Sequence, residues 1–249
     1  MHYELNFGKK IVLRLMVLLS LLLLPNNLLA YSFSGWYHGA SGHDDAIEEA
    51  INEGKPCVVY FHAEWCKWCK RMNSEYLASY ELHQLLSDIP RVEINPDKGS
   101  AEKALLKKYG VRGVPSFFVF IPGSTNNPGQ KIHPFRKGKD WTSDQFLHAI
   151  RAKLVNEYNK RGYSYYKSKK YEEAIHYYEM SIDYDSENVY AYYGMGLAYH
   201  SIAYEEKDTE LMEEAEYNYS KALEADPDHE PSKRALQRLH KAMEKMGVR

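Results

Sequence analysis

The sequence predicts an α/β domain with a mixed sheet, followed by an all-helical region built from repeats. Three observations predict this division. Strand and helix patterns alternate up to residue 154, and only helical patterns follow. Residues 31–154 hold 16 Lys and Arg against 14 Asp and Glu, whereas residues 155–249 hold 13 against 19. Tyrosine is also uneven, since 15 of the 22 lie after residue 154.

The first 30 residues have the pattern of an export signal. Two lysines and an arginine precede an apolar run at 15–24, and Ala30 offers a small residue for cleavage. The run is too short to span about 30 Å of hydrocarbon comfortably as a helix. We therefore expect a cleaved signal peptide over residues 1–30 and a periplasmic or secreted protein. The alternative is an uncleaved N-terminal membrane anchor.

Composition excludes two classes of protein. The formal net charge is −2, and Lys and Arg never gather into a basic tract, so we expect no nucleic-acid partner. The three cysteines, Cys57, Cys66 and Cys69, are too few for a disulfide-stapled scaffold. We expect Cys57, at the start of an interior strand, to be a small buried apolar residue. The other two are candidates for chemistry.

The front region contains the elements of an α/β domain. The predicted elements are, in order, a helix over 44–53, a buried strand over 57–61, a helix from Trp65 towards Leu77, a strand over 91–95, a helix over 101–109 and a strand over 117–121. Turn residues at 126–129 precede a hairpin partner over 131–135, in which Pro134 favours an edge strand. Thr142 and Gln145 form a capping-box pattern that starts the next helix.

The remaining chain is predicted to form two helical repeats, 155–188 and 189–229. The matched positions are Tyr158 and Tyr192, Gly162 and Gly196, Tyr165 and Tyr199, Ala174 and Ala215, and Tyr178 and Tyr219. The second copy has extra residues, for which the polar segment 205–210 offers a loop. Residues 230–246 have the pattern of a capping helix. The order of these positions resembles the tetratricopeptide repeat, a helical hairpin of about 34 residues.

The repeat pattern assigns two roles to side chains. The tyrosines at repeat positions are expected to pack helix against helix: Tyr158, Tyr165, Tyr178, Tyr192, Tyr199 and Tyr219. The repeat register places another set on the concave side: Asn156, Asn159, Tyr163, Tyr166, Tyr190, Tyr193 and His200. That set offers aromatic anchors and amide donors for a peptide partner, or it covers the α/β domain. Since no Gly or Pro lies between Thr142 and Arg161, we also expect a rigid junction between the two regions.

Cys66 and Cys69 have a spacing that several chemistries share. It fits half of a zinc site, haem attachment, copper binding or disulfide exchange. Haem attachment needs His after the second cysteine, where this chain has Lys70. No second Cys-x-x-Cys and no His-x-x-x-His supplies the remaining zinc ligands. A copper chaperone needs Met and His ligands nearby, which this segment lacks.

The position of the pair favours redox chemistry. It follows a buried strand and opens a helix, so the two cysteines lie on one helical face within reach of a disulfide. The helix N-terminus and the charges of Lys67 and Lys70 favour a thiolate. We therefore expect the pKa of the Cys66 thiol to lie below about 8.5, the value for a free cysteine. Trp65 and Trp68 offer apolar surface to a partner polypeptide.

Two segments resemble the motifs of the thioredoxin family. Residues 61–70, Phe-His-Ala-Glu-Trp-Cys-Lys-Trp-Cys-Lys, resemble its redox motif, and residues 110–115 resemble the loop that carries its cis-proline. The resemblance covers residues 36–154 and is nearest to the domains of secreted bacterial proteins. It implies that Cys66 is an exposed nucleophile that forms a mixed disulfide. A more buried Cys69 then resolves it.

The resemblance also implies partners. Pro115 becomes a cis-proline facing the cysteine pair, and the Val114 backbone binds a partner chain as an added strand. Trp65 and Trp68 belong to the same substrate surface. The expected partners are protein substrates with disulfides or thiols and an unidentified electron-donor protein. No metal and no cofactor are expected beyond a redox-active Cys66–Cys69 disulfide.

One position departs from the family. Thioredoxins usually have a buried acid where this chain has Tyr60, and that acid helps to move the proton of the resolving thiol. His62 and Glu64 are the remaining candidates for proton transfer, although Glu64 is expected to be exposed. The alternative for His62 is a histidine at a strand end with its hydrogen bonds satisfied.

The sequence is compatible with three functions. The first is an enzyme, an extracytoplasmic protein thiol–disulfide oxidoreductase, reductase or isomerase, that contributes to cell redox homeostasis and uses the repeats to bind a partner. The second is a repeat-based interaction scaffold in which the redox site is minor or vestigial. The third is a copper or other metal chaperone, which the missing ligands disfavour.

Overall fold

The computed structural model describes residues 31–122 and 131–247, and the residues from Gly35 onward form one compact unit. The predicted signal segment 1–30 and the predicted turn 126–129 lie outside the described residues. The strands are β1 Tyr37–His38, β2 Cys57–Phe61, β3 Arg91–Ile94 and β4 Ser116–Phe120. The front helices are α2 Gly39–Asn52, α3 Lys67–Met72, the π-helix η1 Asn73–Leu77, α4 Tyr80–Leu85 and α5 Ser100–Lys108. The later helices are α6 Ser143–Lys167, α7 Tyr171–Tyr184, α8 Val189–Glu206, α9 Thr209–Ala225 and α10 Glu230–Met246.

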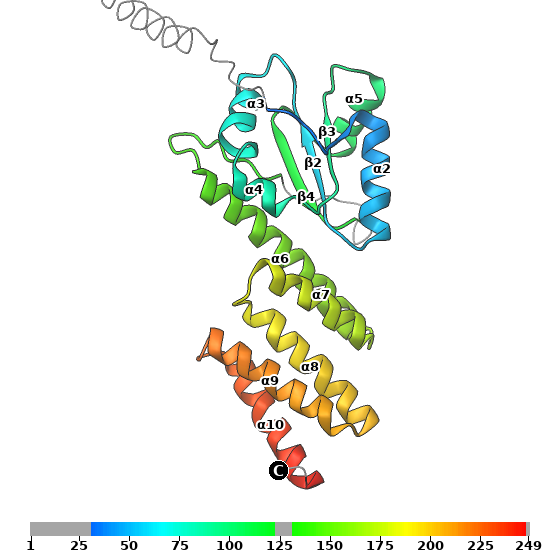
Figure 1. The fold of residues 1–249 in the computed structure, drawn as a ribbon, viewed down its shortest axis with the longest axis vertical. Helices are drawn as coiled ribbons and strands as arrows, with labels where there is room; N and C mark the ends of the chain where they lie inside the picture. Colours follow the sequence, from blue (N-terminus) through cyan, green and yellow to red (C-terminus); the bar gives the residue numbers. More distant parts are fainter. Residues whose placement is uncertain (1–30, 123–130, 248–249) are drawn as a thin grey trace, which may run out of the picture. The chain divides into compact units, whose positions relative to one another are not determined.

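The four described strands form one mixed sheet in the order β1-β3-β2-β4 (Figure 1). β3 is parallel to both β1 and β2, whereas β4 runs antiparallel to β2, with Cys57 opposite Phe120 and Phe61 opposite Ser116. Every residue of β2 and β4 is buried. Because both strands are covered on two faces, they form continuous apolar runs instead of alternating ones. The predicted α/β class with a mixed sheet is confirmed.

Helices cover both faces of this sheet. On the face of α2 and α5, Ala46 and Ala50 pack with Val59, Phe61 and Val92 in one buried cluster. The opposite face carries an aromatic core that links the sheet to η1 and α6: Tyr60, Tyr76, Phe117 and Phe146. In Figure 1, α2 and α5 lie on one side of the strands and α3 and α4 on the other. The cysteine helix α3 therefore rests on the aromatic face.

Residues 131–135 do not form the expected hairpin strand. One isolated bridge joins Ile132 to Phe117, and the chain then leaves the sheet. Pro134 has no N–H to donate to a ladder, and its carbonyl instead accepts a hydrogen bond from the Trp141 amide at 2.9 Å. The segment after Ile132 therefore turns towards α3 and lies beside the cysteine helix.

Two front elements were missed. β1 has two residues, too few for a period-2 pattern, and the helix that follows begins at Gly39, five residues before the predicted start. α4 is a short helix whose N-cap, Ser79, accepts a hydrogen bond from the Leu82 amide at 3.3 Å. The capping box that starts α6 is present as predicted, because Thr142 and Gln145 exchange both hydrogen bonds.

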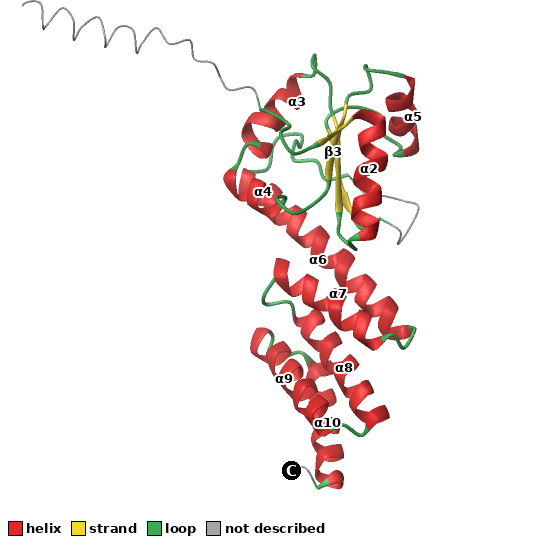
Figure 2. Ribbon diagram, turned by 45° about the vertical axis from the view of Figure 1, so that its right-hand side comes forward, coloured by secondary structure: helices red, strands yellow, loops and turns green. Residues whose placement is uncertain are grey.

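From Ser143 onward every regular element of the described chain is a helix, as Figure 2 shows. The last helix of the α/β domain and the first helix of the repeats are one helix, α6, so the predicted boundary at 154–155 falls inside it. Arg161 on α6 ties the two regions together, because its guanidinium donates to the Pro122 carbonyl at 2.8 Å and to the Tyr177 hydroxyl at 3.1 Å. The absence of Gly and Pro before residue 162 allows this long helix.

Glycines and tyrosines pack together in the repeats. A Cβ at Gly162 would lie 2.8 Å from the Tyr178 ring, and one at Gly196 would lie 2.5 Å from the Tyr219 ring. Both rings therefore need a neighbouring helix without a side chain. Of the six tyrosines predicted as core, Tyr158, Tyr178 and Tyr219 are buried, whereas Tyr165, Tyr192 and Tyr199 are half-buried. The prediction is right for the first three and only partly right for the others.

The extra residues of the second repeat do not form the predicted loop at 205–210. α8 continues to Glu206, Lys207 adopts a left-handed φ of 58°, and Asp208 already caps α9. The side chain of Asp208 accepts hydrogen bonds from the amides of the first turn of α9, which satisfies donors left open at a helix start. The insertion therefore lengthens the two helices. Within the described ranges, no helix is both long and apolar enough for a membrane span.

Candidate active site

Cys66 and Cys69 are joined by a disulfide at the start of α3, with their Cα atoms 5.2 Å apart. Cys66 is the N-cap residue of the helix, with an extended φ of −76° and ψ of 107°. Its sulfur accepts a hydrogen bond from the Cys69 amide at 3.0 Å. A helix N-terminus presents unpaired N–H groups, and these also favour a negative charge on sulfur. The fold therefore places the predicted pair where a thiolate is stabilised.

Both cysteines are buried in this disulfide form. Cys66 is 4% exposed and Cys69 is 1% exposed, so the expectation of an exposed Cys66 is wrong for the oxidised state. The two residues pack with Ala63 and Val114 in one small apolar cluster. The order of exposure still agrees with the prediction, since Cys69 is the more buried of the two.

The Val114–Pro115 peptide bond is cis, as the motif predicted. The Cys66 sulfur lies 3.6 Å from the Val114 carbonyl oxygen, so this loop covers the disulfide directly. Ser116 fixes the loop from the other side, because its hydroxyl donates to the Gly113 carbonyl at 2.8 Å. The structure thus brings together the two segments that the sequence singled out.

The two tryptophans of the motif differ in their surroundings. Trp65 is 72% exposed and its indole N–H donates to the Asp97 carboxylate at 2.6 Å. Trp68 is 49% exposed and packs against Phe135, with ring centroids 4.9 Å apart. The guanidinium of Arg71 lies 5.6 Å from the Trp68 ring centroid. Trp68 therefore belongs to a wall that continues onto the segment after β4, which the sequence did not indicate.

A half-buried carboxylate, Glu93 of β3, holds His62. The Nε2 atom of His62 lies 2.5 Å from one Glu93 oxygen, and the ring of His38 contacts the other oxygen at 2.8 Å. Burial alone raises the pKa of Glu93, but the hydrogen bonds to His62 and then His38 outweigh it and lower the pKa below its ordinary value. The His62 ring also stacks on Tyr60 at 5.3 Å. Glu93 was missed by the sequence reasoning.

Tyr60 and Glu64, the other two polar residues near the motif, also have side-chain partners. Tyr60, which replaces the family's acid, is fully buried and donates to the Asn73 side chain at 3.0 Å. Glu64 is 75% exposed and pairs with Lys98 at 3.0 Å, as expected for a surface carboxylate. Cys57 is free and buried, and burial raises its pKa far above the range of a reactive thiol.

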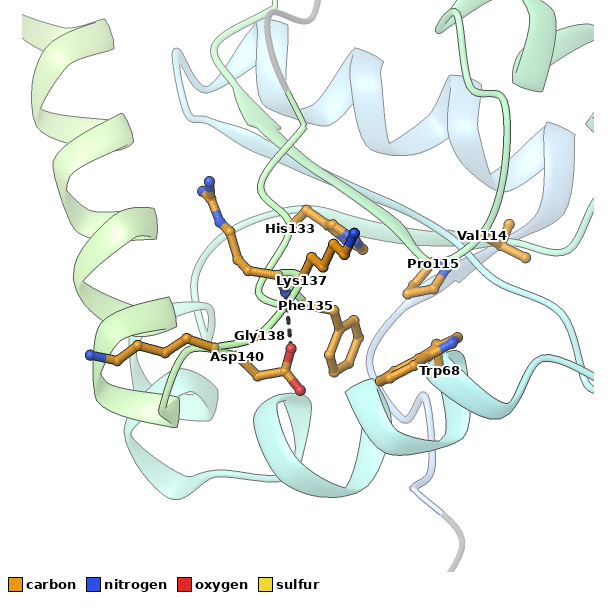
Figure 3. Close-up of a pocket in the computed structure, with 10 residues that line it drawn as sticks. Trp68, Val114, Pro115, His133, Phe135, Lys137, Gly138 and Asp140 are labelled. Carbon is orange, nitrogen blue, oxygen red and sulfur yellow. Dashed lines mark hydrogen bonds between the residues drawn. The ribbon is translucent and has the colours of Figure 1, made fainter.

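A pocket of about 640 Å³ opens beside the cysteine helix. Trp68, Val114 and Pro115 line one side, and the segment 133–140 lines the other. Figure 3 shows Trp68 and Phe135 close together, with Pro115 beside them and the chain of His133, Lys137, Gly138 and Asp140 opposite. Predicted substrate-binding residues and unpredicted ones thus share one surface.

The five predicted groove residues of the repeats differ in their surroundings. Tyr163 is 58% exposed and Tyr190 is 69% exposed. Tyr166 lines a pocket of about 320 Å³ with His200, and the other four do not line it. Tyr193 is half-buried and its ring lies 5.3 Å from His229. Asn159 donates to the side chain of Asn188 at 3.3 Å, which ties it into the helix packing.

Across residues 31–122 and 131–247, no three His, Cys, Asp or Glu side chains come together as a metal site.

Residues 43–130 match the family model of the thioredoxin-like domain, and residues 162–202 match that of the TPR, or tetratricopeptide, repeat. Among curated proteins, the chloroplastic thioredoxin-like protein HCF164 of Arabidopsis thaliana is 34% identical over 34% of this chain and 31% of its own length. The thiol:disulfide interchange protein DsbD of Neisseria meningitidis is 37% identical over 33% of this chain and 14% of its own length. The chain thus spans less than a third of the length of either relative.

Two solved structures are each similar to a part of this chain. The oxidised C-terminal domain of Neisseria meningitidis DsbD matches 48% of this chain and 99% of that domain, with 25% identity and a TM-score of 0.39. The TPR domain of Arabidopsis OM64 matches 39% of this chain and 74% of that domain, with 21% identity and a TM-score of 0.32. On the two family matches, the chain carries a thioredoxin-like domain followed by a region of tetratricopeptide repeats.

Proposed function

We propose that this chain is a protein thiol–disulfide oxidoreductase whose redox pair is Cys66 and Cys69. One observation carries the proposal: the two cysteines form a disulfide at the N-terminus of α3, directly under the cis Val114–Pro115 loop. The curated relatives named as disulfide interchange and thioredoxin-like proteins support it over the stretch that they share. We favour a reductase or an isomerase over an oxidase.

The exchange proceeds in two displacements. In the reduced protein, the Cys66 thiolate attacks one sulfur of a substrate disulfide, forms a mixed disulfide and releases the other substrate sulfur as a thiolate, which takes up a proton. Cys69 then loses its proton, attacks Cys66 and displaces the second substrate sulfur. Two electrons have passed from the protein dithiol to the substrate disulfide. A donor dithiol must return the Cys66–Cys69 disulfide to the reduced form, and no other cofactor takes part.

The surroundings of the pair suit these steps. The Cys69 amide and the helix N-terminus stabilise the Cys66 thiolate. The backbone at Val114 lies beside the sulfur and offers edge hydrogen bonds to a partner chain laid across the loop. Trp65 and Trp68 add exposed apolar surface to that position. The substrate surface therefore combines backbone pairing with aromatic contacts.

For the proton of Cys69 we assign His62 as the better carrier. Its ring Nε2 lies 2.5 Å from the half-buried Glu93, which fixes the orientation of the ring. Glu64 suits this role less, because it is exposed and its charge is paired with Lys98. His62 acts here through its position at the end of β2.

The repeat region serves in this proposal as a partner-binding arm, with Tyr163 and Tyr190 as exposed aromatic anchors.

The basic start and short apolar run of the N-terminal 30 residues support a periplasmic or secreted location. Sequencing the N-terminus of the exported protein tests that location, and a chain that begins at Tyr31 is the expected result.

Reduction of insulin with dithiothreitol as electron donor tests the activity. Wild type is expected to accelerate the reaction, Cys66→Ser to abolish the acceleration, and the matched control Cys57→Ala to keep it, because Cys57 is buried away from the pair. Equal rates for wild type and Cys66→Ser contradict the proposal. That outcome favours the second function, a repeat scaffold with a vestigial redox site.

A further inference from the structure

The pocket beside the disulfide combines an apolar wall with a positively charged rim. The wall is formed by Trp68, Pro115 and Phe135, which continue the surface over the cysteine pair. The rim is formed by the segment 133–140, whose three cationic residues are Arg136, Lys137 and Lys139. A surface of this kind recognises both the apolar and the charged side chains of a bound polypeptide.

Asp140 is the acidic side chain that lines this pocket among the residues the structure describes, and it is already paired. One of its oxygens accepts from the Arg136 amide at 2.9 Å, and the other accepts from the Arg71 guanidinium at 2.5 Å. These contacts lower the pKa of Asp140, with the Arg71 hydrogen bond as the largest cause. The carboxylate therefore stays ionised and paired, and it does not neutralise the lysines of the rim.

The cations of the rim keep their charges available. Among the described residues, the side chains of Lys137 and Lys139 make no ion pair, and Arg136 lies over the Trp141 ring at 4.6 Å from its centroid. An arginine stacked on an aromatic ring keeps its full positive charge. The positive charge also acts on His133 in the same segment. Burial is the largest cause that lowers the pKa of His133, and the charges of Lys131 and Arg136 lower it further.

We propose that the segment 133–140 is a subsite for acidic side chains of the polypeptide whose disulfide is exchanged at Cys66. This inference rests on the proposed function and adds the substrate class to it. A chain laid across Val114 and Pro115 continues past Trp68 into the pocket, where Arg136, Lys137 and Lys139 meet Asp or Glu near its cysteine. The subsite holds the substrate and takes no part in the electron transfer.

Three peptides with one internal disulfide test the subsite. They are identical except at two positions beside one cysteine, which carry Asp-Asp, Ser-Ser or Lys-Lys, and dithiothreitol is the electron donor. Wild type is expected to reduce the Asp-Asp peptide with a kcat/KM about fivefold above that for the Ser-Ser peptide. Two exposed charge pairs contribute a difference of about this size. The Lys-Lys peptide is expected to fall below Ser-Ser by a similar factor. The difference should lie in KM, because the contact is the same in ground and transition states.

Charge-reversed variants locate the effect. Lys137→Glu with Lys139→Glu is expected to invert the order of the Asp-Asp and Lys-Lys peptides, each rate being taken relative to that of the Ser-Ser peptide on the same variant. The matched control is Lys103→Glu with Lys107→Glu on α5, which changes the net charge equally on another surface and should keep the wild-type order. If the double glutamate variant folds poorly, Lys137→Gln with Lys139→Gln is expected to abolish the preference without inverting it.

The possible failures are distinguishable. If wild type reduces all three peptides at one rate, or if the preference survives in both rim variants, the subsite is wrong while the oxidoreductase stands. If no peptide is reduced faster than by dithiothreitol alone, the proposed function itself fails. Raising the salt from about 0.05 M to about 0.5 M should weaken a true charge preference, because the screening length shortens.

Discussion

The sulfur of Cys66 lies 3.6 Å from the carbonyl oxygen of Val114, a residue 48 positions later in the chain. This contact joins the start of α3 to the loop before β4. A substrate sulfur that replaces Cys69 on Cys66 must therefore approach beside the Val114 backbone. The same relationship explains why the disulfide is buried although both tryptophans of the motif are exposed.

Cys69→Ser should trap the first half of the exchange. The variant keeps the nucleophile but lacks the thiol that resolves the mixed disulfide, so a covalent complex with substrate accumulates. Non-reducing mass spectrometry after incubation with a disulfide-bearing peptide measures it. Cys66→Ser is the matched control and should give no adduct. Adducts of equal yield on both variants would mean that Cys66 is not the attacking group.

Glu93→Gln should destabilise the fold at neutral pH by about 1–3 kcal/mol, because the two histidine rings lose their carboxylate partner. The folded pKa of Glu93 is lowered, so its contribution is complete above the unfolded value of 4.5 and is lost as the pH falls through the folded value. Urea unfolding at pH 7 and at pH 3 measures this, and the gap in the free energy of unfolding between wild type and variant should narrow at pH 3. The exposed Glu64→Gln serves as control, with a change below about 0.5 kcal/mol. A gap that widens at low pH would contradict the assignment.

Gly162→Ala should destabilise the repeats by about 2 kcal/mol or more, because a Cβ there lies 2.8 Å from the buried Tyr178 ring. Thermal unfolding followed by circular dichroism checks it. Gly113→Ala is the matched glycine control, since a Cβ at that position meets open space. Comparable losses in the two variants would remove packing against Tyr178 as the cause.

Arg161→Ala should cost about 1.5–3 kcal/mol, because hydrogen bonds from a charged donor to Pro122 and Tyr177 are lost at the junction. Its neighbour Lys160, which is exposed and lies 3.9 Å from the Glu157 carboxylate, supplies the control variant Lys160→Ala. That control should change stability by about 0.5 kcal/mol or less. If Arg161→Ala behaves like the control, the shared helix α6 alone holds the two regions together.

Much of the site was predictable because it is local in the sequence. The buried run of β2, the i, i+3 spacing of the cysteines at a helix start, and the Thr142–Gln145 capping box each depend on neighbours within a few residues. The helix-to-helix packing of Tyr158, Tyr178 and Tyr219 was also indicated, since matched positions recur in the same order in the two copies. These features can be recognised in the sequence without knowing the order of the strands in the sheet.

The missed features depend on contacts between distant segments. Glu93 reaches His62 only because β3 lies parallel to β2, with Glu93 opposite Tyr60. The sequence offered one signal for Glu93, because this acid alternates with apolar residues in the predicted strand 91–95. Phe135 joins Trp68 because Pro134 takes the chain out of the sheet, and no local pattern fixes where it goes next.

The ionisation of reduced Cys66 tests the central claim most directly. Thiolate absorbance at 240 nm in the reduced Cys69→Ser variant, followed from pH 4 to pH 10, measures it, while the buried Cys57 stays protonated. We predict a transition with a pKa clearly below about 8.5, the value of an unperturbed cysteine, because the N-terminus of α3 stabilises the anion. A transition at or above that value would contradict a thiolate held ready for disulfide exchange.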